Sequence, residues 1–432
     1  MFLCFGDNMD KLVNYLEINI FNQKNYQKVL LWFILIAVLS CIKTNVNKVR
    51  NSSITMYGEA ADLIPASMIM TRDGGYLLTC NEQKLTEKTS HIKLIKTDPQ
   101  GNVEWNYQFK SGNNYDLTYG VVQKQDGSYF FSGVRYADKK YILCGGTTSN
   151  GDSAGYNAYS LGVYDDEGRY IMKTSDGNYL LTGKTWSFRT GLGYYLPEGY
   201  LLKIDANGKK IWGRNINSYN TNILARSYED KSGNYLGCGQ SFQLYDTSHY
   251  FGALITKYSS SGTRIWVKEF HFKKHTYTMA TGICGTADGA YMVAADTTDD
   301  QSTGTKSPVA GIMKIAPDGT KLWEKLYPPV EGYNFAENIL PTQDGNFILF
   351  GKTQSSLTQI VYPMAIKLGP SGEIIWNKVY FGSRDADMVS LVQRPDGGYT
   401  AALSYESGYY LEGSKYHCAA LLWLDANGNV LK

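Results

Sequence analysis

Two groups of side chains in this sequence have the types that bind metal ions. His271 and His275 are four residues apart, the spacing that places two imidazoles on one face of a helix for zinc. They fall at the end of an expected strand and in the loop after it, without a Glu between them, which does not favour zinc. Asp296, Asp299 and Asp300 offer hard oxygen atoms, but not with the spacing of a calcium loop. We therefore predict no metal site and no cofactor.

Aromatic and charged residues gather in the long, dissimilar loops between the expected strands. Rings can cover the apolar faces of a glycan or peptide while charges fix its orientation. Trp186 is the strongest single candidate, because it lies outside the position at which tryptophan repeats along the chain. The alternative for any one tyrosine is a half-buried place at a strand edge. The candidate ligand-binding residues are Trp186, Phe188, Tyr194, Tyr245, His249, His271, His275, Tyr333, Arg384 and Asp385.

A repeated unit must position these loops. An Asp-Gly-x-Tyr/Phe motif, with Ser for Asp in one copy, begins at seven places separated by 53, 50, 56, 56, 56 and 52 residues. A Gly and a Trp four residues apart follow in five units. A regular period of this length indicates a repeat architecture rather than one large core. The motifs begin at Asp73, Asp126, Asp176, Ser232, Asp288, Asp344 and Asp396. The Gly/Trp pairs are Gly101/Trp105, Gly208/Trp212, Gly262/Trp266, Gly319/Trp323 and Gly372/Trp376.

Each unit contains four short stretches rich in β-branched and aromatic residues. In the first unit we predict strands at 68–71, 76–80, 92–97 and 103–109, with Asp and Gly supplying tight turns. Four-stranded sheets repeated around a ring form a β-propeller. The sequence therefore predicts an all-β fold: one seven-bladed propeller of four-stranded antiparallel blades over residues 53–432.

The two ends of the propeller region predict how the ring closes. Residues 54–69 resemble the last strand of the sixth unit and the strand after it, whereas the chain stops where its own last strand should begin. We therefore expect the N-terminal strand to complete the last blade, which leaves no long open edge. Residues 126–175 do not fit the pattern, since 138–145 resembles an extra second strand.

A family resemblance supports the repeat. The segment 205–212, Asp-Ala-Asn-Gly-Lys-Lys-Ile-Trp, resembles the tryptophan-docking repeat of quinoprotein-like propellers. Together with Asp-Gly-Gly-Tyr at 73–76 and Ile-Lys-Thr-Asp at 95–98, it is similar to secreted bacterial propellers of uncharacterised function. The Asp-to-Gly distance is one residue shorter than in the quinone enzymes, and a quinone-binding set is missing. The resemblance implies the fold and no particular activity.

The first 41 residues predict export. Residues 29–40 are uncharged and mostly apolar, and twelve helical residues rise about 18 Å against about 30 Å of hydrocarbon, which suits a signal-peptide core. Val-Leu-Ser-Cys at 38–41 resembles the lipobox of bacterial lipoproteins, which implies that Cys41 is lipidated. The protein would then be anchored to a membrane of the bacterial cell envelope. Residues 42–52 would form a flexible tether between the lipid and the propeller. The alternative is a short membrane anchor with Cys41 incidental.

Composition narrows the partners. The 42 basic and 40 acidic residues give a formal charge of +2, and the basic residues form no stripe. The charge pattern therefore gives no reason to expect nucleic-acid binding. No phosphate loop, nucleophile elbow or Cys–His pair appears in the required context, so we name no catalytic residue. The function that we expect is a non-catalytic module that binds a protein or carbohydrate. The alternatives are a polysaccharide hydrolase or lyase with its site at the channel mouth, and an envelope scaffold. A close carboxylate pair in the channel would favour the enzyme, and a flat aromatic patch the binder.

Overall fold

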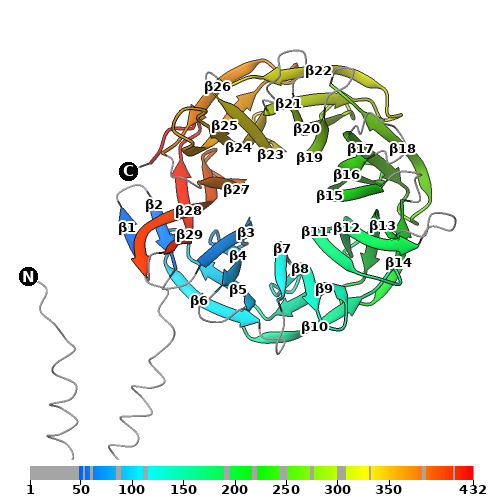
Figure 1. Ribbon diagram of the computed structural model, residues 1–432, viewed down its shortest axis with the longest axis horizontal. Helices are drawn as coiled ribbons and strands as arrows, with labels where there is room; N and C mark the ends of the chain where they lie inside the picture. Colours follow the sequence, from blue (N-terminus) through cyan, green and yellow to red (C-terminus); the bar gives the residue numbers. More distant parts are fainter. Residues whose placement is uncertain are drawn as a thin grey trace, which may run out of the picture. The chain divides into compact units, whose positions relative to one another are not determined.

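Seven antiparallel sheets form a ring, and we call the region enclosed by their innermost strands the channel (Figure 1). The computed structural model describes residues 48–51, 54–58, 62–83, 89–109, 115–188, 195–216, 221–242, 251–272, 277–298, 308–329, 332–381, 386–411 and 414–431. All regular elements in these ranges are strands, and none of the described residues forms a helix long and apolar enough to cross a membrane. The predicted seven-bladed propeller is confirmed.

The blades follow the chain, and each begins with the strand nearest the channel. Blade 1 contains β3 (Asp62–Met70), β4 (Tyr76–Gln83), β5 (Ser90–Thr97) and β6 (Val103–Phe109). Blade 2 contains β7 (Leu117–Gln123), β8 (Tyr129–Tyr136), β9 (Lys140–Thr147) and β10 (Ser153–Tyr159). Blade 3 contains β11 (Asp166–Lys173), β12 (Tyr179–Phe188), β13 (Tyr195–Ile204) and β14 (Lys210–Asn215). Blade 4 contains β15 (Thr221–Glu229), β16 (Tyr235–Phe242), β17 (Phe251–Tyr258) and β18 (Arg264–Phe270).

The remaining blades follow the same order. Blade 5 contains β19 (Thr278–Gly285), β20 (Tyr291–Thr298), β21 (Pro308–Ile315) and β22 (Lys321–Tyr327). Blade 6 contains β23 (Tyr333–Pro341), β24 (Phe347–Gln354), β25 (Val361–Leu368) and β26 (Ile374–Val379). Blade 7 contains β27 (Asp387–Gln393), β28 (Tyr399–Leu411) and β29 (Ser414–Leu424), and is completed by β2 (Ile54–Tyr57) and β1 (Lys48–Asn51).

The N-terminal strand closes the ring as predicted. β2 pairs antiparallel with β29, with Ile54 opposite Leu422 and Tyr57 opposite Ala419. The hydroxyl of buried Tyr57 donates a hydrogen bond of 2.7 Å to the carbonyl oxygen of Gly101, in the β5–β6 turn of blade 1. β1 pairs with β2 as a fifth strand, so the end of the stretch that we expected to be a tether is paired backbone. Residues 42–47, the apolar segment 29–40 and Cys41 lie outside the described residues.

Blade 2 differs from the expectation for 138–145. This stretch is not an extra second strand, because its residues from Lys140 onward belong to β9, the third strand, which pairs with β8 on one side and β10 on the other. The second and third strands are joined by a short turn, in which Ala137 N–H donates to Lys139 O, instead of a long loop. Gly155 stands four residues after Gly151, where other units have tryptophan. The usual Gly–Trp signal of the outer strand is therefore missing.

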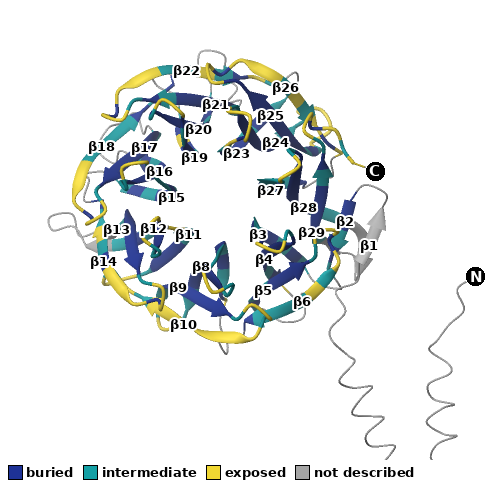
Figure 2. Cartoon of the chain, turned by 180° about the vertical axis from the view of Figure 1, so that it is seen from behind, coloured by how far each residue is buried: buried dark blue, intermediate teal, exposed yellow. Residues whose placement is uncertain are grey.

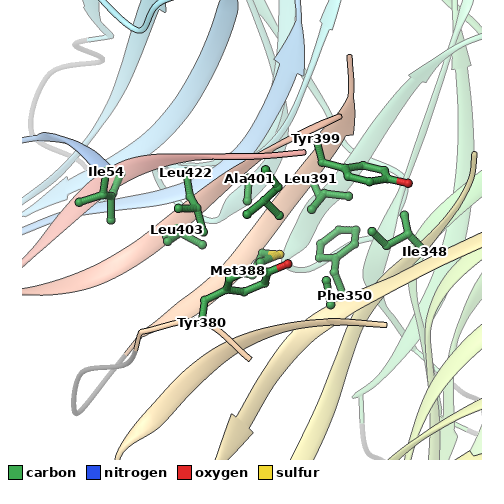
Figure 3. Close-up of a cluster of buried hydrophobic side chains, with 13 residues drawn as sticks. Ile54, Ile348, Phe350, Tyr380, Met388, Leu391, Tyr399, Ala401, Leu403 and Leu422 are labelled. Carbon is green, nitrogen blue, oxygen red and sulfur yellow. The ribbon is translucent and has the colours of Figure 1, made fainter. Parts of the chain in front are cut away.

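The hydrophobic core lies between neighbouring blades. The two middle strands of each blade are mostly buried, the innermost strands alternate between buried and partly exposed residues, and the outer strands are the most exposed (Figure 2). Between blades 6 and 7, Phe350 of β24 packs with Met388 of β27 and Leu403 of β28, and Ile54 joins the same cluster from β2 (Figure 3). The N-terminal strand thus contributes apolar surface as well as hydrogen bonds to the closing blade.

Repeated tryptophans connect the outer strands to the next blade. Trp212 of β14 donates its indole N–H to Ser260 O at 3.3 Å, and a Cβ atom on Gly262 would lie 2.9 Å from its ring. Trp105 of β6 makes the equivalent bond of 3.1 Å to Ser149 O in blade 2. In blades 4, 5 and 6 the Gly four residues before the Trp belongs to the turn that contacts the preceding blade's outer-strand tryptophan, so the motif holds these blades together.

Candidate functional site

Each innermost strand contains a β-bulge at the same place. The unpaired residue lies seven positions before the Asp or Ser of the Asp-Gly motif in every blade. Because a bulge re-aims a side chain and these strands surround the channel (Figure 1), the seven residues form a set that we call the bulge ring. Only two of its members carry charge, Arg169 and Glu337. The bulge ring consists of Ala66, Tyr119, Arg169, Ala225, Thr281, Glu337 and Val389.

Glu337 is joined to a blade two places away. Arg226 Nη2 of blade 4 lies 2.7 Å from Glu337 Oε1 of blade 6. Arg226 Nε also donates a hydrogen bond of 3.2 Å to the carbonyl oxygen of Thr281 in blade 5, the blade between these two. The guanidinium also lies 5.5 Å from the ring centroid of Tyr170 in blade 3. Arg226 therefore connects the innermost strands of four consecutive blades.

Three carboxyl groups from three successive blades line one hollow of 530 Å³. They are Asp296 of β20, Glu337 of β23 and Asp387 of β27. Asp296 Oδ1 accepts a hydrogen bond of 2.6 Å from the backbone N–H of Ala336, next to Glu337. Lys352 Nζ of β24 lies 2.8 Å from Asp387 Oδ2 in the same hollow. The ring thus brings two cations and three carboxyl groups together at the channel.

Two of these carboxyl groups hold protons more tightly than usual. Burial raises the pKa of Asp296 to about 7, and the nearby charge of Glu337 adds to the effect, while the Ala336 N–H bond opposes it. Burial among the channel strands also raises the pKa of Glu337, against the opposing effect of Arg226. The Glu337 side chain is 40% exposed, so water reaches its carboxyl group and limits the rise in its pKa. Asp296 is the more strongly perturbed group near neutral pH.

An aromatic wall continues the hollow toward blade 4. A second hollow of 550 Å³ shares Met279, Asp296 and Phe335 with the first, and adds Phe251 and Tyr277. The Phe251 and Tyr277 rings are 4.9 Å apart between centroids at 30°. We call the two adjoining hollows the channel groove. One part is apolar and ring-lined, and the other holds the charged groups.

A basic cluster occupies the opposite part of the ring, in blades 2 and 3. Glu167 of β11 lies 3.1 Å from Lys140 Nζ, 3.1 Å from Lys184 Nζ and 3.3 Å from Arg169 Nη2. Burial would raise the pKa of Glu167, but these cations hold it below its usual value. The cluster is an internally paired network, with more positive than negative charge.

The sequence-predicted site residues fall in three groups. Trp186 lies in blade 3, with the Lys184 ammonium 6.0 Å from its ring centroid. His271 Nε2 lies 3.1 Å from Glu269 Oε1 after β18, and Tyr333 begins β23. None of these three lines the channel groove within the described part of the chain. For Phe188 only the backbone, at the end of β12, is described. The candidates outside the described residues are Tyr194, Tyr245, His249, His275, Arg384 and Asp385.

The groove residues were largely missed in the sequence, although a signal for them exists. Aligning the units on their Asp-Gly motifs places Glu337 at a position that is mostly small or uncharged elsewhere. It also places Asp296 and Lys352 at one position, five residues after the motif's Tyr or Phe. At these two positions the charge of the side chain differs from unit to unit, although the turn motif beside them is repeated. Such variation is typical of an exposed surface rather than a core. The second position holds Asn81, Val134, Lys184, Gln240, Asp296, Lys352 and Ser404.

Comparison with known proteins places this chain by fold. No protein-family model and no curated protein sequence matches it. Among solved structures, the polysaccharide lyase Uly1 matches with 10% identity and a TM-score of 0.53, covering 86% of this chain and 91% of that one. An ulvan lyase bound to a saccharide matches with 9% identity and a TM-score of 0.54, covering 87% and 96%. At such low identity, the likeness shows a shared propeller fold.

Proposed function

We propose that this propeller is a binding module whose ligand is a saccharide held in the channel groove. The supporting observation is that the aromatic wall around Phe251 and Tyr277 adjoins the charged hollow of Asp296, Lys352 and Asp387. A sugar ring presents apolar C–H faces for the aromatic side chains, and hydroxyl groups that hydrogen-bond to carboxylates and ammonium groups. The groove offers both surfaces side by side.

The shape of the groove favours a saccharide over a folded protein. Concave sites of about 300–1,000 Å³ are typical for small ligands, and hollows of 530 and 550 Å³ fall in this range. A stable protein interface needs about 800 Å² from each partner, usually over a flatter surface. The solved neighbours that act on polysaccharides share the fold, and their substrates do not transfer to this chain at 9–10% identity.

The cellular location of the protein is part of the same proposal. The apolar segment 29–40 and the lipobox-like residues ending at Cys41 support export to a bacterial cell envelope and anchoring through a lipidated Cys41. Metabolic labelling with a clickable fatty acid tests this directly. The full chain should take up label, and the Cys41→Ser variant should not. Equal labelling of both would contradict lipidation at Cys41.

Ligand binding is tested with the full chain in detergent on a glycan array, followed by calorimetry with each hit. Phe251→Ala and Tyr277→Ala should each weaken binding at least about tenfold, because each removes a ring from the aromatic wall. Tyr156→Ala is the matched control, since this exposed ring lies on outer strand β10 of blade 2. The proposal fails if no glycan binds, or if the groove variants bind as tightly as the control.

A further inference from the structure

We propose that the channel groove also hydrolyses its saccharide, with Asp296 as the general acid and Glu337 as the base that activates water. This inference rests on the proposed saccharide binding and adds a reaction to it. Glycoside hydrolysis needs one carboxyl group that donates a proton and another that accepts one, on either side of the scissile bond. The groove supplies carboxyl groups from blades 5 and 6 in a single hollow.

The ion pairs decide which carboxyl group holds the proton. Arg226 lies 2.7 Å from Glu337 and opposes the rise in the pKa of that carboxyl group, and Lys352 lies 2.8 Å from Asp387. Among the described residues, Asp296 forms no ion pair with a cation and accepts only the backbone N–H of Ala336. Its raised pKa agrees with this assignment. Of the two, Asp296 therefore keeps its proton in preference to Glu337, whose carboxylate form Arg226 stabilises.

Blade 1 shows that the acid is not needed for folding. Asn81 occupies the position in β4 that Asp296 occupies in β20. Asn81 Oδ1 accepts a hydrogen bond of 2.8 Å from the backbone N–H of Thr118, the residue before the bulge of blade 2. An amide therefore makes the same contact between blades at lower desolvation cost. A carboxyl group at Asp296 is more than the structure requires, which points to a chemical role.

The reaction balances without a cofactor. Asp296 donates its proton to the glycosidic oxygen as the bond from that oxygen to the anomeric carbon breaks. Glu337 removes a proton from a water molecule, whose oxygen forms the new bond to the anomeric carbon. One water is consumed, and proton exchange with solvent restores both carboxyl groups. The adjacent Phe251 and Tyr277 rings would hold the neighbouring sugar units.

The charge of the groove favours hydrolysis over elimination. With Asp296 protonated, Arg226 and Lys352 are matched by Glu337 and Asp387, and each cation is already paired. A lyase must neutralise the carboxylate of a uronic acid, and among the described residues of the groove each cation already has a carboxylate partner. The substrate class is therefore a neutral or amino-sugar glycan rather than a polyuronate.

The test measures binding and cleavage separately on the full chain in detergent. Laminarin, xylan, arabinan and chitosan are the probes, alginate is the polyuronate control, and new reducing ends report cleavage. Asp296→Asn should still bind a probe, because the amide keeps a hydrogen-bonding oxygen, but it should lower kcat at least about a hundredfold and remove the alkaline limb of the pH profile. Glu337→Gln should remove the acid limb. Glu324→Gln, on outer strand β22, is the matched control and should behave as wild type.

The outcomes separate the two proposals. Binding without cleavage of any probe overturns hydrolysis and leaves saccharide binding intact. Cleavage that survives in Asp296→Asn, or that is confined to alginate, also overturns the assignment. If no probe and no array glycan binds, both proposals fall.

Discussion

Arg226 of β15 and Glu337 of β23 form an ion pair of 2.7 Å, although the whole of blade 5 separates their strands along the ring. The side chain crosses the innermost strand of blade 5 and donates to Thr281 O on the way. Such a contact is possible only at the channel, where the inner strands converge. It links blades that share no sheet hydrogen bonds, and it stabilises the carboxylate form of Glu337 in the groove.

This pair should be coupled in stability measurements. Because Glu337 keeps 40% of its side-chain exposure, we expect a coupling energy of about 0.5–1.5 kcal/mol, near the upper end for partly exposed pairs. A double-mutant cycle of Arg226→Ala, Glu337→Ala and the double variant, measured by urea unfolding, gives this value. Strictly additive single effects would show that the two side chains act independently.

Asp296 should make stability depend on pH. Its native pKa of about 7 lies above the value of about 3.9 in an unfolded chain, so the native state binds more protons between these limits. Stability should therefore be full below pH 4 for this group and be lost as the pH rises through 7. Asp296→Asn has no carboxyl group to ionise at this position. Its free energy of unfolding relative to wild type should therefore be about 1–3 kcal/mol higher at pH 8 than at pH 4.

Unfolding curves of wild type and Asp296→Asn at the two pH values check this sign. Glu324→Gln serves as the control for a charge removed from the outside of blade 5. A variant that gains equally at both pH values would mean that the native pKa of Asp296 is not raised above its unfolded value, contrary to its burial.

Alanine substitutions at two glycines should separate the energetic cost of disturbing a packed tryptophan from the cost of backbone strain. Gly262 and Gly177 both have φ of 79°. A Cβ atom on Gly262 would lie 2.9 Å from Trp212, whereas one on Gly177 meets nothing within 4 Å. Gly177→Ala should cost about 1 kcal/mol from strain, and Gly262→Ala about 2–4 kcal/mol because the ring must also move. Equal losses in chemical unfolding would show that the ring does not pack tightly on the turn.

The closing junction should be as strong as an ordinary one. Tyr57 donates to Gly101 O at 2.7 Å, and Tyr327 donates to Gly372 O at 2.9 Å between blades 5 and 6. Tyr57→Phe and Tyr327→Phe should each lower the free energy of unfolding by about 1–2 kcal/mol, because a buried carbonyl loses a donor. If only the Tyr327 variant is destabilised, β2 does not hold the ring shut in solution.

Sequence reasoning recovered the repeats, the blade count and the closing strand, because each depends on local physics. Tight turns need Asp and Gly, so the seven motifs recur with the turns themselves. The missing last strand was visible because residues 54–57 repeat the outer-strand pattern. The strands of blade 2 could not be assigned from the sequence, because a short turn replaces its loop and Gly155 stands in place of the tryptophan.

The groove was decided by tertiary structure. Arg226, Asp296, Glu337 and Asp387 are spread over four blades, and they meet only because the ring closes around a channel. Whether Glu337 faces that channel depends on a bulge, which is set by pairing between two strands and not by either sequence alone. The raised pKa of Asp296 likewise comes from neighbours on other blades. A chain encodes its turns residue by residue, whereas burial and charge coupling exist only once distant strands are packed together.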